Sequence, residues 1–273
     1  MTDTSLPPVL SLRDVELTLM AASGPIHILD HVSLDVRAGE SVAIIGPSGS
    51  GKSSLMAVSA GLERATSGEI ILLGEPVTGR NEGELARLRR GRVGFVFQSF
   101  HLMPTMTALE NVMAPLEIAR QDRVRERATG ALSQVGLEHR LTHYPGQLSG
   151  GEKQRVAVAR ALAVGPEIIF ADEPTGNLDT AAGGMIADFL FEAARQHGAA
   201  LVLVTSPTGP TALLKCVTGR SSHECGSGPA DCRTGIARRY TWFPGFPRLP
   251  DAWRRRDCGG RVGERDVPPR RCR

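Results

Sequence analysis

The stretch Gly46-Pro-Ser-Gly-Ser-Gly-Lys-Ser-Ser54 matches the pattern G-x-x-x-x-G-K-[ST] and follows directly on an apolar run, residues 42–45. This order predicts a buried strand, then a loop whose backbone N–H groups surround a phosphate, then a helix that begins near Lys52. Glycine allows the tight loop, and the helix presents its positive end to the same anion. A simple glycine turn between a strand and a helix is the alternative, and two motifs further along the chain argue against it.

The side chains of this loop suit the triphosphate of a nucleotide. We expect Lys52 to reach the β- and γ-phosphates and the Ser53 hydroxyl to bind Mg²⁺. The predicted phosphate-binding set is the whole loop, namely Gly46, Pro47, Ser48, Gly49, Ser50, Gly51, Lys52, Ser53 and Ser54. The stretch therefore predicts ATP and Mg²⁺ as ligands.

Apolar runs on both sides of the loop predict an α/β fold. The expected strands are residues 9–19, 26–29, 32–36, 42–45, 69–73, 93–97, about 167–172 and 199–205. The expected helices are residues 52–61, 82–90, about 148–163 and 180–196, with a further helical segment at 107–138. No apolar run approaches the ~20 residues that a membrane span requires, so we expect a protein that stays in the cytoplasm.

An acidic pair ends one of the buried strands. Asp172 and Glu173 follow an apolar run within the stretch Glu167-Ile-Ile-Phe-Ala-Asp-Glu-Pro174. We expect Asp172 to serve the Mg²⁺ site and Glu173 to polarise the water that attacks the γ-phosphate. The alternative is that the two acids merely cap the next helix.

A second glycine-containing stretch, Leu148-Ser-Gly-Gly-Glu-Lys-Gln-Arg155, precedes a helix that runs to about residue 163. Ser149, Gly150 and Gly151 at a helix N-terminus would offer a hydroxyl and backbone amides to another phosphate. Taken alone, the stretch is also explained by a simple N-cap with a glycine turn.

Together these stretches resemble the motifs of ABC transporter ATPases. The resemblance covers roughly residues 9–205 and includes Gly94-Phe-Val-Phe-Gln-Ser-Phe-His-Leu-Met-Pro104, which is similar to the family's Q-loop, and Thr175-Gly-Asn-Leu-Asp179, which is similar to its D-loop. The stretches Phe95–Thr105 and Ala171–Asp179 resemble the ATPase subunits of the lipoprotein-releasing and macrolide-exporter branch, and within that branch the chain is most similar to the subunits paired with large predicted permeases. The implied fold is a P-loop NTPase core with an N-terminal antiparallel β subdomain and an inserted helical subdomain at about 99–160, ending before the family's last strands.

The resemblance also implies how the site is assembled. Gln98 is expected to contact Mg²⁺ and the attacking water, and Asp179 to reach the opposite subunit. Two copies are expected to hold two ATP molecules head to tail, with Ser149–Gly151 of one copy completing the phosphate loop of the other. The implied activity is ATP hydrolysis that drives an integral-membrane permease, docked between residues 99 and 117 at the inner face of the plasma membrane.

The chain departs from the family pattern in two places. No Tyr, Phe or Trp precedes Phe95, so we expect the adenine to rest on Leu19, Met20 or His27. The family continues its last core strand with Thr-His-Asp, whereas this chain has Thr205-Ser206-Pro207. A nucleotide-binding, dimerising module with impaired hydrolysis is therefore an alternative function.

Composition changes abruptly at residue 206. Residues 206–273 contain fourteen of the 32 basic residues but only six of the 29 acidic ones, together with all five cysteines and both tryptophans. This segment lacks helix or strand periodicity, and we expect it to be a disordered Arg/Pro/Gly/Cys-rich tail, hypothetically the product of an altered reading frame.

Other readings of the tail and of the whole chain are weaker. A nucleic-acid arm would use Tyr240, Trp242 and Trp253 for stacking, and a zinc site lacks any C-x₂-C pair. ABC ATPases of DNA repair insert long coiled coils between the phosphate loop and the second glycine stretch, but here only about a hundred residues without heptads intervene. We therefore expect no nucleic-acid partner.

Overall fold

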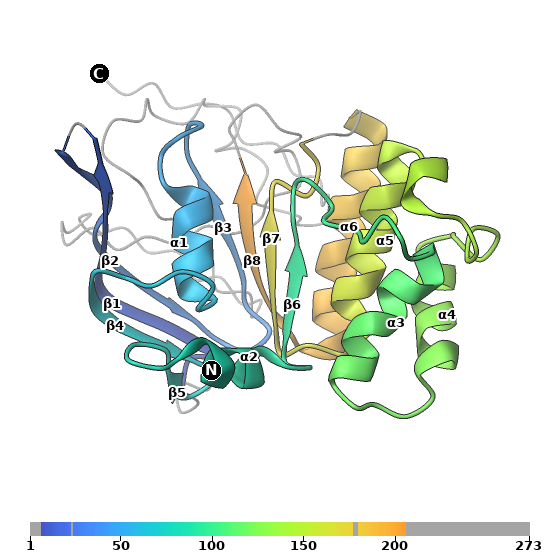
Figure 1. The fold of residues 1–273 in the computed structure, drawn as a ribbon, viewed down its shortest axis with the longest axis horizontal. Coiled ribbons are helices and arrows are strands. Elements are labelled where there is room, and N and C mark those ends of the chain that lie inside the picture. The colour runs from blue at the N-terminus through green and yellow to red at the C-terminus, as the bar shows by residue number, and fades with distance from the viewer. Residues whose placement is uncertain (1–6, 23, 177–179, 206–273) are drawn as a thin grey trace, which may run out of the picture. The chain divides into compact units, whose positions relative to one another are not determined.

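The computed structural model of the chain describes residues 7–22, 24–176 and 180–205. Its strands form two four-stranded sheets (Figure 1). The antiparallel sheet has the order β2-β1-β4-β5, formed by β1 (Leu10–Ala21), β2 (Gly24–Val36), β4 (Ser67–Leu72) and β5 (Glu75–Pro76). The parallel sheet has the order β3-β8-β7-β6, formed by β3 (Ser41–Ile45), β6 (Val93–Val96), β7 (Ile168–Asp172) and β8 (Ala200–Thr205).

Six α-helices accompany these sheets in the described part of the chain. They are α1 (Lys52–Ser59), α2 (Glu82–Arg89), α3 (Ala108–Ile118), α4 (Val124–Gln134), α5 (Gly150–Leu162) and α6 (Thr180–His197), with a 3-10 turn at Pro145–Gln147. Helix α1 contacts β2, β7 and β8, and α3, α4 and α5 pack on one another. In Figure 1 these three helices and α6 gather on the β6 side of the parallel strands.

The parallel sheet brings the predicted catalytic stretches to one edge. Strands β7 and β8 are buried almost throughout, as expected for a parallel sheet whose two faces are covered. Ile45 pairs with Thr205, and Asp172 pairs with Val204, so β3, β7 and β8 end at the same edge. The loop after β3 and the acidic pair at the end of β7 are therefore neighbours, as the carboxyl ends of parallel strands require.

Helix α5 belongs to two hydrophobic clusters. Val156 and Ala159 pack in the cluster formed with α3 and α4, which is the core of the helical lobe. Val158 and Leu162 pack in the other cluster, with β6, β7, β8 and α6. Helix α5 is thus shared between the lobe and the parallel sheet, and the lobe expected at about 99–160 has no sharp boundary within this helix.

The predicted elements are all present, but the helical segment expected at 107–138 is divided into α3 and α4, the short strand β5 was not predicted, and one pair of predicted strands is merged. Two strands were expected at 26–29 and 32–36, but the structure has a single strand, β2. The pairing of β1 with β2 shifts register between Leu12 and Thr18, and His31 adopts a left-handed backbone with φ of 48°. A β-bulge breaks the apolar alternation while the ladder continues, which explains the wrong division.

The tail expected at 206–273 lies outside the described residues, and so do Ser206 and Asp179. Within the described ranges, none of the helices has both the length and the apolar character that crossing a bilayer requires.

Candidate active site

The loop after β3 has the backbone that its glycines predict. Gly49 and Gly51 have φ of 79° and 83°, a left-handed conformation that favours glycine. A Cβ on Gly51 would lie 2.7 Å from the carbonyl oxygen of Ile28, so this position has no room for a side chain. Gly51 is the N-cap of α1, and no side chain caps that helix. The first turn of α1 therefore offers backbone N–H groups to an anion.

Two polar side chains of the loop are buried in it. Lys52 is only 5% exposed, and its Nζ donates a hydrogen bond of 2.7 Å to the carbonyl oxygen of Pro47. The ammonium group therefore lies across its own loop rather than in solvent. The Oγ atom of Ser50 is buried without a hydrogen-bond partner. A bound phosphate would offer hydrogen-bond acceptors to the Ser50 hydroxyl and a negative charge to the Lys52 ammonium.

Asp172 is the last residue of β7 and lies close to Ser53 and Lys52 of the phosphate loop. Burial raises the pKa of Asp172; a hydrogen bond from the Ser53 hydroxyl opposes this rise, the nearby charge of Glu173 adds to it, and that of Lys52 opposes it. Oδ1 of Asp172 is buried and has no hydrogen-bond partner. The structure thus brings two of the three predicted metal ligands, Ser53 and Asp172, into contact. A hydroxyl, one carboxylate and phosphate oxygens form the kind of oxygen-rich set that Mg²⁺ prefers.

No group of three or more His, Cys, Asp or Glu side chains able to hold a metal occurs in the part of the chain that the structure covers. Asp172 is thus not part of such a group. This agrees with the usual pattern, in which Mg²⁺ is held by one or two carboxylates together with substrate phosphates.

Glu173 is held in an unusual backbone conformation. Its φ is 41°, in the left-handed region, and its N–H donates a hydrogen bond of 2.9 Å to the carbonyl oxygen of Val204. The Oε2 atom of Glu173 accepts a hydrogen bond of 3.0 Å from Nε2 of Gln98. A Cβ on Gly176 would come within 3.3 Å of the same Oε2 atom. Such strain is often found at functional sites, and here it accompanies a fixed carboxylate.

Ser149 is the N-cap of α5 and forms a capping box. Its Oγ accepts a hydrogen bond of 3.2 Å from the N–H of Glu152, and Glu152 Oε2 accepts one of 2.8 Å from the N–H of Ser149. Nε of Arg140 donates to Oε1 of the same glutamate at 2.9 Å. The Ser149 N–H lowers the pKa of Glu152, and Arg140 lowers it further. The S-x-x-E spacing could have predicted Glu152, whereas nothing in the sequence pointed to Arg140.

The second glycine stretch does not join the phosphate loop of its own chain. Helix α5 packs on the edge strand β6, whereas α1 packs on β7 and β8 (Figure 1). No hydrogen bond links Ser149–Gly151 to residues 46–54 among the described residues. Ser149 and Gly150 are exposed, and a Cβ on Gly150 would meet nothing within 4 Å. The predicted site residues therefore fall into two separate groups, with Gln98, Asp172 and Glu173 beside the phosphate loop.

The expected base-contact residues lie near the end of the β1–β2 hairpin. Leu19 pairs with Ile26 across the two strands, and these side chains are 44% and 46% exposed. Met20 is 80% exposed, and Nδ1 of His27 is hydrogen-bonded to Oγ1 of Thr18. Leu19 with Ile26 forms an aliphatic surface, and the sequence prediction did not include Ile26.

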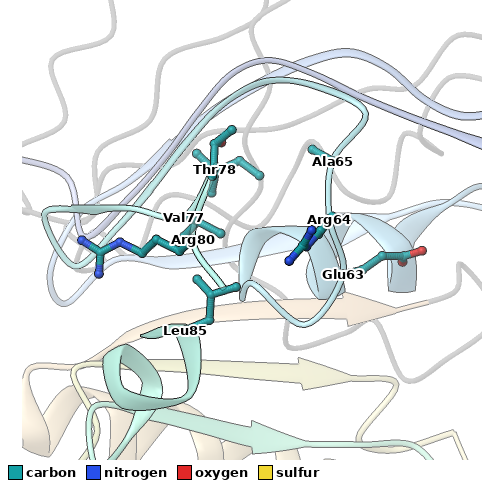
Figure 2. Close-up of a pocket in the computed structure, with 9 residues that line it drawn as sticks. Glu63, Arg64, Ala65, Val77, Thr78, Arg80 and Leu85 are labelled. Atoms are coloured by element: carbon teal, nitrogen blue, oxygen red, sulfur yellow. The ribbon is translucent and has the colours of Figure 1, made fainter. Parts of the chain in front are cut away.

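A separate small pocket lies between the segment that follows α1, the β4–β5 hairpin and α2 (Figure 2). Its volume is about 120 Å³, below the ~300 Å³ of typical small-molecule sites. Its lining residues are Glu63, Arg64, Ala65, Ile70, Val77, Thr78, Gly79, Arg80 and Leu85. None of them belongs to the predicted site.

Comparison with known proteins identifies the family. The family model described as ABC transporter matches residues 29–176. The chain is 51% identical over 182 residues to the uncharacterized ABC transporter ATP-binding protein YbbA of Escherichia coli K12, covering 66% of this chain and 80% of YbbA. It is 48% identical over 200 residues to the lipoprotein-releasing system ATP-binding protein LolD 2 of Caulobacter vibrioides, covering 72% and 88%.

Solved structures of this fold include the bacterial ABC transporter cassette MJ0796 as a dimer, and the same cassette in a dimeric post-hydrolysis state bound to ADP and Pi. Each matches with a TM-score of 0.68 and 40% identity, over 72% of this chain and 87% of the cassette. None of these matches supports the alternative of impaired hydrolysis. The chain belongs to the ABC transporter family, as an ATP-binding and ATP-hydrolysing transporter subunit of the branch that includes LolD.

Proposed function

We propose that two copies of this chain close head to tail around two Mg-ATP molecules and so drive a membrane permease of the lipoprotein-releasing type. The observation that carries this proposal is the division of the site into two groups within one chain. Ser149 and Gly150 are exposed at the tip of α5, and among the described residues no hydrogen bond connects Ser149–Gly151 to the phosphate loop of the same chain. A second copy would bring its own phosphate loop to this tip, and the matched MJ0796 cassette is dimeric.

The phosphate loop and the end of β7 would bind Mg-ATP. The backbone amides of residues 46–54 and the Lys52 ammonium hold the phosphates, and the hydrogen bond from Lys52 to Pro47 pre-positions that ammonium. Ser53, Asp172 and Gln98 would hold Mg²⁺, which supplies charge neutralisation at the β- and γ-phosphates. Oδ1 of Asp172, buried without a hydrogen-bond partner, supports this assignment.

Glu173 would act as the general base toward the attacking water. Its carboxylate is oriented by Gln98 at 3.0 Å and by a left-handed backbone, so it needs little reorganisation when nucleotide binds. Gln98 would share the water with Glu173. In the closed dimer, Ser149, Gly150 and Gly151 of the second copy would complete the γ-phosphate contacts, and Asp179 would lie at the seam between the copies.

The permease is the part of the proposal that rests on relatives. LolD is named as the ATP-binding protein of a lipoprotein-releasing system, and we propose a lipid-anchored or lipid-like cargo for this chain as well. The docking groove would lie between residues 99 and 117, at the inner face of the plasma membrane. Met103 in this segment is 37% exposed.

Two substitutions test the assigned roles in one steady-state experiment. Glu173→Gln removes the base but keeps the shape, so we expect turnover to fall roughly 100-fold or more while Mg-ATP still binds as in the parent. Lys52→Ala removes the buried ammonium, so Mg-ATP binding itself should weaken. Equal turnover in the parent and Glu173→Gln, or unchanged Mg-ATP affinity in Lys52→Ala, would contradict the assignment.

A further inference from the structure

The segment that follows Gln98 has a backbone that needs outside support. Phe100 and His101 are consecutive residues with φ of 59° and 47°. Both positions are left-handed, a conformation that residues with side chains rarely adopt even singly. Such a pair persists only where surrounding contacts hold it.

Arg160 supplies that support from the last turns of α5. Its Nη1 donates a hydrogen bond of 2.6 Å to the carbonyl oxygen of His101, and its Nη2 donates one of 2.8 Å to that of Phe100. The planar guanidinium is suited to two parallel bonds of this kind. Burial lowers the pKa of Arg160, but the group remains charged at any physiological pH. A partly buried cation that donates to two carbonyl oxygens restrains this backbone strongly.

The clamped residues lie only two and three positions after Gln98, whose Nε2 donates to Oε2 of Glu173 at 3.0 Å. We propose that Arg160 is a positioning residue for hydrolysis: it fixes the backbone at 100–101 so that the Gln98 amide stays against the Glu173 carboxylate. Arg160 itself does not contact Glu173 or the phosphate loop in the described structure.

The same helix extends the inference to the second copy, and this step rests on the proposed function. Ser149 caps the N-terminus of α5, eleven residues before Arg160, which corresponds to roughly 16 Å along an α-helix. Residues of α5 pack in both hydrophobic clusters. Arg160 therefore links the helix tip that faces the partner's nucleotide to Gln98 beside the chain's own nucleotide.

A double-mutant cycle separates positioning from general support. In Arg160→Lys, a single ammonium cannot hold both carbonyls in the fork geometry, so we expect kcat to fall about tenfold with the KM for ATP within about twofold. In a Gln98→Ala background the same Arg160→Lys change should alter kcat by less than about twofold, because the Gln98 amide that Arg160 positions is absent.

Arg127→Lys is the matched control. Arg127 Nη2 donates to the carbonyl oxygen of Ala163 at the end of α5, at 3.2 Å, but does not contact residues 100–101. Its kcat should stay within about twofold of the parent. Equal losses from Arg160→Lys in both backgrounds, with parent turnover intact, would overturn the proposal without affecting the proposed function.

Amide hydrogen exchange tests the clamp without any turnover. The N–H of His101 bonds to Ser99 and that of Phe100 to Phe97, so both amides should exchange faster in Arg160→Lys, while amides in the middle of α5 stay as protected as in the parent. Unchanged exchange at residues 100 and 101 would overturn the positioning role. Loss of Mg-ATP turnover by the parent chain would instead count against the proposed function.

Discussion

At the scale of single residues, Asp172 is a half-buried carboxylate whose surroundings disfavour its charged form. Burial raises its pKa, which means that the folded chain without metal holds a proton on this carboxyl more tightly than the unfolded chain does. The contribution of this group to stability is therefore fully present below the pKa of an unfolded aspartate and is lost as the pH rises through the raised pKa. Mg²⁺ needs the charged form, so metal binding at this site should strengthen over the same rise in pH.

The change Asp172→Asn should separate these two effects. We expect the Asp172→Asn variant without nucleotide, heated in EDTA at neutral pH, to unfold at a temperature equal to or above that of the parent. The variant no longer has a partly buried charge at this position. The same variant should lose the Mg²⁺-dependent part of ATP binding. Asp122→Asn, in the exposed loop between α3 and α4, is the control and should change neither measurement. A clear fall in the unfolding temperature of Asp172→Asn in EDTA would be the opposite of the expected result.

At the scale of elements, Asn111 joins helix α3 to the loop that precedes it. Its side chain is fully buried, and Oδ1 accepts a hydrogen bond of 2.8 Å from the N–H of Met103. Nδ2 donates to the carbonyl oxygens of Met103, Met106 and Thr107 at 3.0–3.1 Å. One amide thus satisfies a stretch of irregular backbone inside the segment proposed to dock the permease.

Replacing this amide should be costly. Asn111→Ala leaves buried backbone groups without partners, so we expect the free energy of unfolding to fall by roughly 2–3 kcal/mol in urea denaturation. Asn81→Ala is the comparison, because Asn81 caps α2 on the surface and its loss should cost only about 1 kcal/mol. If the two variants lost the same stability, the buried network around Asn111 would be no more than an ordinary cap.

Most helices and strands were predictable from the sequence because their apolar patterns and capping residues agree with how they pack in the structure. The loop 46–54 is enclosed by a strand and a helix, and Asp172 ends a fully apolar run, so local rules sufficed there. The single strand β2 was missed because its bulge at His31 interrupts the alternation. Arg140 and Arg160 were missed because their partners, Glu152 and the carbonyls of residues 100–101, become neighbours only through tertiary packing.

At the scale of the whole molecule, the two groups of residues proposed to form one hydrolytic site lie at two separate places in the described chain. One place is the sheet edge with Lys52, Asp172 and Glu173, and the other is the exposed tip of α5 at Ser149. In the proposed dimer, each of these places would bind the phosphates of a nucleotide together with the other place on the second copy. ATP-dependent pairing of two copies is therefore the central claim, because it gives both places a function at once.

The most direct test is the molar mass of Glu173→Gln by size-exclusion chromatography with light scattering. With Mg-ATP we expect about twice the 29.1 kDa mass of one chain, since blocked hydrolysis holds the closed state. With ADP, or with Lys52→Ala added to the same chain, the mass should return to that of one chain. A mass of one chain in Mg-ATP, measured where binding of the nucleotide is confirmed, would contradict the account.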